Sequence, residues 1–200
     1  MKRLIATLSL LAMLTACQTS STKENPLLTE STLDYQAPDF SKIRPAHFVP
    51  AIEEGIRIQL AEIDSITSNT AAPTFENTVL AYEKSGRLLA RATSILSALV
   101  GADGTEELQK IDEETTPMLS AHHDALLLNE KLFARIKAVY DQRSSLQGED
   151  LRLTEVLYDQ FVHEGALLSA ADKEALKKIN SEIAVLQTKF TNQVNAGTKE

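Results

Sequence analysis

Residues 73–101, PTFENTVLAYEKSGRLLARATSILSALVG, carry the most regular apolar pattern in this 200-residue chain. Apolar side chains recur every three or four positions along two adjacent lines: Val79, Tyr82, Leu89, Leu96 and Val100 on the first, and Leu88, Ala92, Ile95 and Leu99 on the second. At about 3.6 residues per turn, this spacing predicts one helix of roughly seven turns with a wide apolar face. Such a face needs cover from more than one side, so we expect the other helices to pack around it.

The remaining sequence predicts an all-α fold of about six antiparallel-packed helices. Apolar residues at helical spacing mark segments at about 46–66, 129–143 and 149–164, and others that begin near residues 105 and 169. No run of β-branched residues alternating with polar ones is closed by an Asn-Gly or Asp-Gly turn. Five of the six prolines precede or open the long helix, which indicates an irregular N-terminal entry.

Candidate start and stop signals accompany the predicted helices. Side-chain caps are expected at four helix starts, provided by Thr74 with Asn77, Thr105, Asn129, and Ser169 with Asp172. Gly101 is expected to end the long helix, and Gly165 the helix before the last one. Pro117 is expected to kink or split the third helix. Leu60 and Val156 are assigned to buried faces by their spacing.

The last predicted helix has an apolar stripe with no following element to cover it. Its members step by three or four positions: Leu176, Ile179, Ile183, Leu186, Phe190 and Val194. We therefore expect this stripe to lie uncovered, and we expect the helix at 73–101 to carry an excess of apolar surface meant for a missing partner.

The N-terminus is typical of an export signal that ends in a lipid attachment site. Lys2 and Arg3 form a basic start, and residues 4–14 form an apolar run too short to span a membrane. Leu14-Thr15-Ala16-Cys17 resembles a bacterial lipoprotein cleavage box, in which the cysteine becomes lipidated. The alternative is an ordinary secretory signal with a cysteine nearby. We predict a signal peptide over residues 1–16, lipidated Cys17 with a tether over 17–39, and a helical domain over 40–200.

The location and the charge of the mature chain limit the classes of partner that it can bind. Gln18 after the cysteine resembles the pattern of lipoproteins that are not retained at the inner membrane, so we predict an outer-membrane lipoprotein facing the periplasm. Without Lys2 and Arg3, 18 basic residues stand against 28 acidic ones. This balance offers no basic surface for nucleic acid, nor for anionic lipid. Cys17 is the single cysteine, so the chain has no intrachain disulfide and no other candidate thiol nucleophile.

The four histidines do not form a recognisable metal site in the sequence. His163-Glu164 begins like the zinc-peptidase motif His-Glu-x-x-His, but the fourth position holds Leu167 and Gly165 interrupts the helix. His122 and His123 are adjacent, so their side chains point about 100° apart on a helix and are expected at the surface. His163 is likewise expected to be exposed at a helix end, and His47 to pack or to cap a turn.

No catalytic residue is predicted from the remaining polar groups. Glu53-Glu54 and Asp112-Glu113-Glu114 are acidic runs on predicted helices, and we interpret them as solvated faces. The sequence has neither a glycine-rich phosphate loop nor a Gly-x-Ser-x-Gly nucleophile turn. The predicted sites are therefore no catalytic residue, no metal ligand, and lipidation at Cys17.

Six short motifs, in order along the chain, carry a family resemblance. They are Asn25-Pro-Leu-Leu28, residues 40–52, Pro73-Thr-Phe-Glu-Asn-Thr78, Leu128-Asn129-x-x-Leu132-Phe133, Phe161-Val162-x-x-Gly165-Ala166-Leu167-Leu168-Ser169, and Phe190 with Asn192. Together they resemble the N-terminal region of the thimet-oligopeptidase family, and most of all its bacterial peptidyl-dipeptidase and oligopeptidase A branch. The resemblance extends over nearly all of the chain from Asn25.

The resemblance implies a mostly helical zinc metallopeptidase that cuts short peptides inside a deep channel. Its zinc motif, His-Glu-x-x-His with a further Glu ligand, lies far beyond the region matched here, so no catalytic or metal residue is carried over. We expect the chain to be the non-catalytic N-terminal part of such a lipoprotein peptidase, to form part of the channel wall, and to be inactive alone. Zinc, short peptides and the missing catalytic domain would belong to the complete enzyme.

Two other hypotheses stay open at this point. The chain could be a non-enzymatic helical lipoprotein that binds peptides or a protein partner, or a decayed remnant without function. A His-Glu-x-x-His motif in frame after codon 200 would favour the peptidase, whereas a stop codon with a stable monomeric protein would favour the binding protein. Poor folding with exposed apolar surface would favour the remnant.

Overall fold

The computed structural model describes residues 25–197, and every regular element in that range is helical. Six longer α-helices make up the fold, as predicted: α1 (Phe48–Thr67), α3 (Arg87–Asp103), α4 (Glu106–Leu127), α5 (Glu130–Asp141), α6 (Gly148–His163) and α7 (Ala170–Gly197). The short elements are η1 (Pro26–Leu28), η2 (Asp34–Gln36), η3 (Pro45–His47), η4 (Phe75–Leu80), α2 (Ala81–Glu83) and η5 (Arg143–Ser145). The all-α prediction is confirmed.

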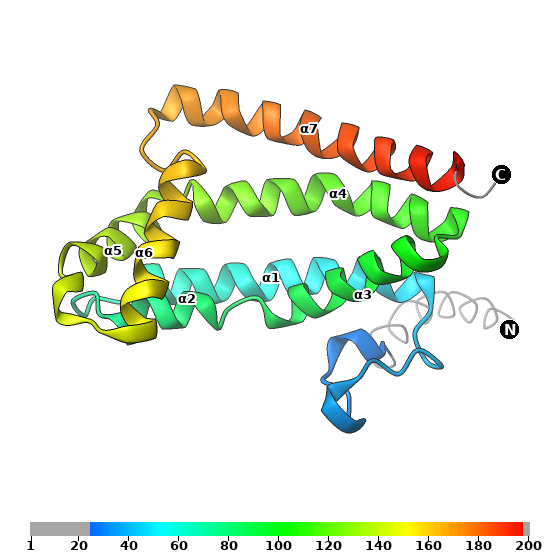
Figure 1. The fold of residues 1–200 in the computed structure, drawn as a ribbon, viewed down its shortest axis with the longest axis horizontal. Helices are drawn as coiled ribbons and strands as arrows, with labels where there is room; N and C mark the ends of the chain where they lie inside the picture. The colour runs from blue at the N-terminus through cyan, green and yellow to red at the C-terminus, as the bar shows by residue number, and fades with distance from the viewer. Residues whose placement is uncertain (1–24, 198–200) are drawn as a thin grey trace, which may run out of the picture.

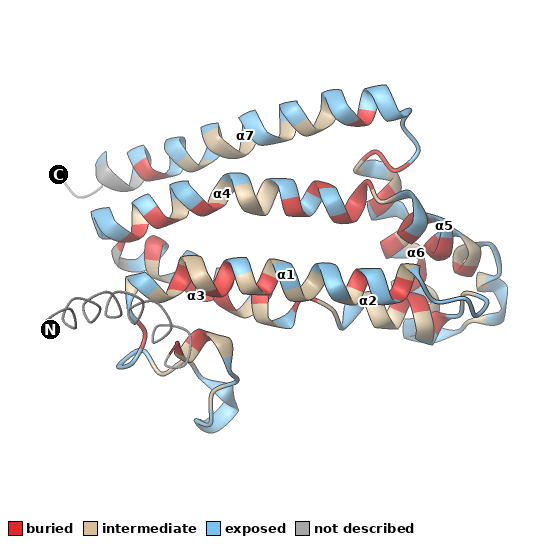
Figure 2. Cartoon of the chain, turned by 180° about the vertical axis from the view of Figure 1, so that it is seen from behind, coloured by how far each residue is buried: buried red, intermediate tan, exposed pale blue. Residues whose placement is uncertain are grey.

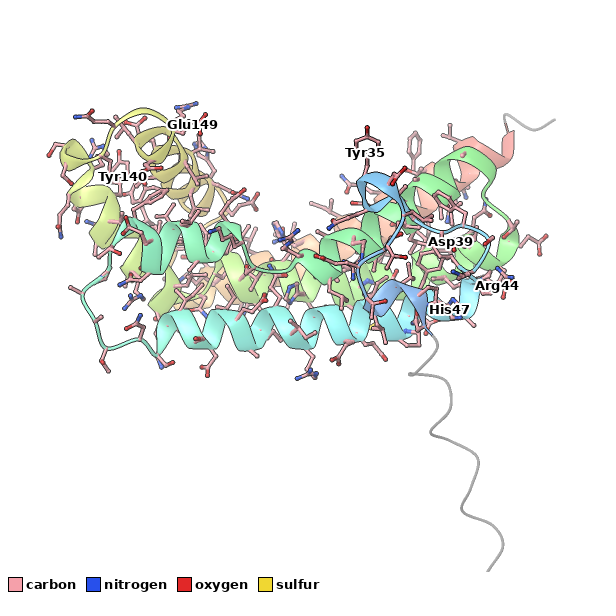
Figure 3. All side chains as sticks on the ribbon, turned by 90° about the horizontal axis from the view of Figure 1, so that it is seen from below. Tyr35, Asp39, Arg44, His47, Tyr140 and Glu149 are labelled. Carbon is pink, nitrogen blue, oxygen red and sulfur yellow. The ribbon has the colours of Figure 1, made fainter. Side chains whose placement is uncertain are left out.

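The long helices lie side by side as an elongated stack (Figure 1). α1 packs on α3, α4 packs on both of them, and α7 runs along the outer side of α4. α5 and α6 pack on each other across one end of the stack, and the N-terminal arm lies at the other end. Figure 3 shows the two ends from below, with Tyr35 and His47 on the arm and Tyr140 and Glu149 at the α5–α6 end.

The predicted helix over residues 73–101 is divided in the structure. η4, with π-helical winding, and α2 form its first part, residues 84–86 make a turn, and α3 follows. Gly86 adopts a left-handed φ of 71°, its N–H donates to the Glu62 carboxylate of α1 at 2.8 Å, and an added Cβ would lie 2.3 Å from Gln59 Nε2. The single seven-turn helix is therefore wrong. The apolar lines are nevertheless buried on both sides of the turn, as Val79 and Leu96 show.

Two other details of the helix boundaries differ from the sequence-based expectations. α3 continues through Gly101 to Asp103, because a glycine within a helix lowers its stability but does not by itself end the helix. α4 runs as one helix past Pro117, so it is not split there. Pro117 is exposed, and α4 as a whole packs against α1, α3 and α7.

The expected side-chain caps are present. Thr74 and Asn77 cap each other's backbone N–H groups at the start of η4, and Thr105 and Asn129 accept from Leu108 N and Leu132 N. Ser169 Oγ accepts from Asp172 N at 3.2 Å and donates to the Asp172 carboxylate at 2.7 Å. Gly165 follows the end of α6 with a φ of 100°, as its role as a stop requires.

The buried side chains form two groups at opposite ends of the stack (Figure 2). One joins the N-terminal arm, the start of α1, α3 and the start of α4: Leu27, Ile43, Phe48, Ala51, Ile52, Leu89, Ala92, Ile95, Leu96, Val100, Leu108 and Ile111. The other joins the end of α1, η4, the end of α4, α5 and α6: Ile63, Ile66, Phe75, Val79, Leu126, Leu127, Leu132, Phe133, Ile136, Val139, Leu157, Phe161 and Ala166. Leu60 and Val156 are 42% and 43% exposed, so their assignment to buried faces is wrong.

The N-terminal arm is attached to the bundle from Asn25 onward. Leu27 is 1% exposed within the first group, Asn25 Nδ2 donates to His47 O at 2.8 Å, and Arg91 donates to Leu27 O at 3.0 Å. The expected tether over residues 17–39 thus includes a segment, from Asn25 to Leu28, that is packed. Among residues 25–197, no helix is long and apolar enough to cross a membrane.

Candidate functional site

Polar side chains, and few apolar ones, join α4 to α7. Along this seam Asn192 donates to the Glu113 carboxylate at 3.0 Å, and Asn180 donates to Asp124 at 2.7 Å. Between these pairs, the hydroxyls of Thr116 and Thr188 share a hydrogen bond of 2.9 Å. Residues late in α7 thus pair with residues early in α4, which defines an antiparallel register for the two helices.

A hollow of about 590 Å³ opens within this seam. Its wall consists of Thr116, Leu119, Ser120, His123 and Asp124 of α4, Asn180, Ile183, Ala184, Gln187 and Thr188 of α7, and Glu164. Most of these groups are hydroxyls, amides or carboxylates. The hollow can therefore receive a hydrogen-bonding side chain, while Leu119 and Ile183 offer apolar contacts at its wall.

The apolar stripe of α7 lies on a different side of the helix from the seam. Ile179, Ile183, Leu186, Phe190 and Val194 are between 46% and 67% exposed, whereas Asn192 on the seam is 7% exposed. In Figure 1, α7 is the outermost helix, and Figure 2 shows little buried surface along it. The expectation of an uncovered stripe is confirmed from Ile179 to Val194, whereas Leu176 is half-buried. The periodicity of the stripe is visible in the sequence.

His122 is buried, contrary to the prediction of a surface residue. It is 6% exposed, and its Nε2 lies 2.7 Å from Gln59 Oε1 of α1, while its Nδ1 is buried without a partner. Burial first, and then the neighbouring His123, lower the pKa of His122. Gln59 in turn donates to Ser85 at 3.3 Å beside the Gly86 turn. His122 therefore links α4, α1 and the break between α2 and α3.

The other histidines lie apart from one another. His123 is exposed, as predicted, and its Nε2 is 3.8 Å from a Glu164 carboxylate oxygen, an open ion pair that contributes little. His163 is exposed at the last position of α6, as predicted. His47 Nδ1 accepts a hydrogen bond from Arg44 N at 3.1 Å, which confirms the capping role.

The acidic runs face solvent in most positions. Glu53, Glu113 and Glu114 are exposed, and Glu54 pairs with Arg57 at 2.7 Å. Asp112 is half-buried, and burial first, and then Glu113, raise the pKa of its carboxyl group. Asp124, predicted to be at the surface together with the two histidines, is instead 5% exposed because it faces α7.

The described residues do not fit the zinc ion that the family resemblance implies. His122 points to Gln59 on α1, whereas His123 points to Glu164, so the two imidazoles lie on different sides of α4. Within residues 25–197 no three His, Cys, Asp or Glu side chains are grouped so that they could hold a metal ion. We therefore derive no metal-dependent step from this part of the chain.

The motifs behind the family resemblance have mainly structural roles. Asn77 accepts from Arg135 at 3.0 Å and donates to Ala72 O at 2.9 Å, so Pro73-Thr-Phe-Glu-Asn-Thr78 is tied to α5. Phe75 and Phe161 lie in the same buried group. Asn129 and Gly165 begin and end helices. Phe190, Leu167 and Phe40, at 67%, 65% and 55% exposed, are motif residues that project into solvent.

Comparison with known proteins adds two findings. A family model described as "Prokaryotic membrane lipoprotein lipid attachment site" matches residues 1–18, which include Cys17 but lie outside the described residues. The match identifies an exported, membrane-anchored lipoprotein.

Relatives match almost the whole chain, but only part of their own length. Dipeptidyl carboxypeptidase from Salmonella typhimurium is 45% identical over 177 residues, which are 88% of this chain and 26% of the relative. The Escherichia coli K12 protein of that name is 43% identical over 180 residues, which are 89% of this chain and 26% of that relative. Oligopeptidase A from Salmonella typhimurium is 24% identical over 172 residues, which are 85% of this chain and 25% of that relative.

The chain thus spans about a quarter of the length of the curated relatives that it matches. The matched quarter is the N-terminal one. The chain is therefore a homologue of the N-terminal part of the dipeptidyl carboxypeptidase and oligopeptidase A family.

Proposed function

We propose that the chain is the N-terminal, non-catalytic portion of a lipoprotein zinc metallopeptidase that hydrolyses short peptides. The observation that carries this proposal is the 45% identity, over 88% of the chain, to a protein named dipeptidyl carboxypeptidase, of which the match covers 26%. In this proposal the helical stack forms part of the wall of the substrate channel. The zinc ligands and the catalytic groups belong to polypeptide outside the matched quarter.

The hydrogen bonding of the motif residues supports a scaffold role. Arg135 is 9% exposed and donates to Asn69 O, Ala71 O and Asn77 Oδ1, so it holds the loop before η4 against α5. Groups engaged in this way position backbone, and are not free to bind a substrate. A rigid wall element needs this kind of anchoring more than it needs reactive side chains.

A peptidase assay tests the proposal. Purified 200-residue chain is incubated with short peptides and zinc, with and without a chelator, and should release no product. Sequencing of the gene past codon 200 should then show His-Glu-x-x-His in frame. Chelator-sensitive cleavage by the purified chain would refute the non-catalytic role.

We also propose that Cys17 anchors the protein at the outer membrane, facing the periplasm. Gln18 in the position after the lipidated cysteine supports this location, and the several acyl chains of a bacterial lipoprotein are enough for stable anchoring. A radioactive fatty acid should label the wild-type protein and fractionate with it to the outer membrane. Label that persists in Cys17→Ser would contradict the assignment.

One observation favours a second candidate, a helical lipoprotein that binds peptides or a protein partner. The stripe on α7 is an exposed apolar surface of the kind that binds polypeptide. The two candidates differ in whether the surface is covered by the same polypeptide or by another one.

A further inference from the structure

α7 directs its polar side toward the bundle and its apolar side away from it. The seam residues Asn180, Thr188 and Asn192 recur at helical spacing and face α4. At 100° per residue, the stripe from Ile179 to Val194 lies about 150° around the helix from them. An amphipathic helix that covered a bundle as its last layer would show the opposite arrangement.

Hydrogen bonds specify this orientation of α7. A rotation that buried Leu186 and Phe190 against α4 would break the contact of Asn180 with Asp124, whose carboxylate is 5% exposed. It would also remove Asn192 from Glu113. A buried polar group that loses its hydrogen-bond partner costs free energy, so the rotated arrangement of α7 is less stable than the observed one. The packing of α7 on α4 therefore keeps the stripe exposed.

The exposed stripe is long enough to contact a partner helix, and it borders a hollow that could fix the orientation of that helix. From Ile179 to Val194 the stripe extends about 22 Å at 1.5 Å per residue, which corresponds to about four turns of a partner helix. Ile183 belongs both to the stripe and to the wall of the hollow between α4 and α7. A partner packed on the stripe could therefore insert a polar side chain toward Asp124 and Asn180.

We propose that the α7 stripe is the docking surface for an amphipathic helix of the polypeptide that makes up the other three quarters of the dipeptidyl carboxypeptidase-type relatives. This inference rests on the proposed function. The relatives supply the occupant: about 74% of their length lies outside the match, and α7 is at the outer edge of the matched part. Binding buries Leu186 and Phe190, and the seam with α4 stays as it is.

The test co-expresses the full chain with the unmatched three quarters of the Salmonella typhimurium dipeptidyl carboxypeptidase. The matched quarter of that enzyme serves as the positive control for co-purification. Leu186→Glu with Phe190→Glu should weaken co-purification by about 30-fold or more, as expected for two central apolar contacts. Lys178→Glu with Lys189→Glu, on an exposed side of the same helix, should change it less than about 3-fold, although it adds more negative charge.

A thiol-labelling measurement makes the result independent of affinity and of any folding defect. The chain has Cys17 as its single cysteine, so Leu186→Cys and Lys178→Cys each add one thiol, and the wild type is the blank. Position 186 should react with a maleimide in the chain alone and be protected at least 10-fold in the complex. Position 178 should react equally in both.

The outcomes separate the inference from the proposed function. Co-purification that survives the stripe substitutions, or equal labelling of position 186 in the complex, would overturn the docking surface and leave the proposed function standing. A failure of wild-type chain to co-purify, where the control quarter succeeds, would overturn both. Concentration-dependent protection of position 186 in the chain alone would show that a second copy, and not the remaining polypeptide, covers the stripe.

Discussion

Two helix pairs in this molecule use their apolar residues in opposite ways. Between α1 and α3, Ile52 and Leu89 are buried, and Gly55 allows so close an approach that an added Cβ would lie 2.8 Å from Leu89 Cα. Between α4 and α7, the contact is made by amides, hydroxyls and carboxylates around an open hollow. The apolar stripe of α7 from Ile179 to Val194 stays exposed. An apolar stripe at helical spacing can thus be buried within the chain, as on α3, or left exposed by it, as on α7.

The largest expected effect comes from substituting an isoleucine in each of the two helix pairs. Ile52→Ala removes a fully buried side chain between α1 and α3 and should lower the free energy of unfolding by about 2 to 5 kcal/mol. Ile183→Ala removes a side chain that is 46% exposed and should cost less than about 1 kcal/mol in the chain alone. Urea unfolding followed by circular dichroism measures both. Equal losses would mean that α7 packs with its stripe inward.

A glycine pair tests the closeness of the α1–α3 contact. Gly55→Ala places a methyl group against the Leu89 backbone and should cost about 1 to 3 kcal/mol. Gly101→Ala, in the same kind of helical backbone but in open space, should instead stabilise the chain by about 0.5 to 1 kcal/mol. Thermal unfolding of both variants gives the comparison. A neutral Gly55→Ala would show that the helices can separate without cost.

The polar seam between α4 and α7 should contribute to the stability of the fold through its hydrogen-bonded pairs. Asn180→Ala leaves the buried Asp124 carboxylate without its amide donor and should lower the free energy of unfolding by about 1 to 2 kcal/mol. In Asp124→Ala with Asn180→Ala no unpaired carboxylate remains, so the double variant should lose less than the sum of the single ones. A double-mutant cycle in urea measures the coupling. Strict additivity would place Asp124 and Asn180 apart in solution.

The smallest expected effect is the dependence of the free energy of unfolding on the protonation of His122. Because burial lowers its pKa in the folded chain, the unfolded chain binds a proton more readily there. The resulting stability is fully present above the ordinary pKa of 6.5 and is lost as the pH falls toward and through the lowered folded value. The difference in unfolding free energy between wild type and His122→Gln, measured from pH 7.5 to 5.5, should therefore shrink toward acid. A difference that grows toward acid would contradict the sign.

Much of the bundle could be predicted because it depends on local signals. Asn129 and Ser169 cap helices through their own neighbours in sequence, and Gly165 ends one through its own backbone angle. The break at Gly86 could not be found in this way, since the apolar lines continue on both sides of it. The turn depends on Glu62 and Gln59 of α1, which become neighbours only after folding.

The candidate site was harder to predict for a related reason. His122 falls on the same side of α4 as Leu119 and Leu126, so its position in the helix could have indicated burial, but its polarity suggested the surface. Asp124 faces α7, and its partner Asn180 is 56 residues away. The exposed stripe was predictable from its spacing alone. In the docking proposal its role depends on polypeptide outside the matched quarter of the relatives.

The turn at Gly86 has a consequence for the cooperativity of unfolding. It lies where the two buried groups meet, with η4 and α2 contributing to one and α3 to the other, and only α1 and α4 extend through both. A native protein can open in contiguous units of different free energy. Backbone amides of α5 and α6 should therefore exchange with deuterium as one set and those of α3 as another, with the α1 and α4 amides divided between the two sets along their length.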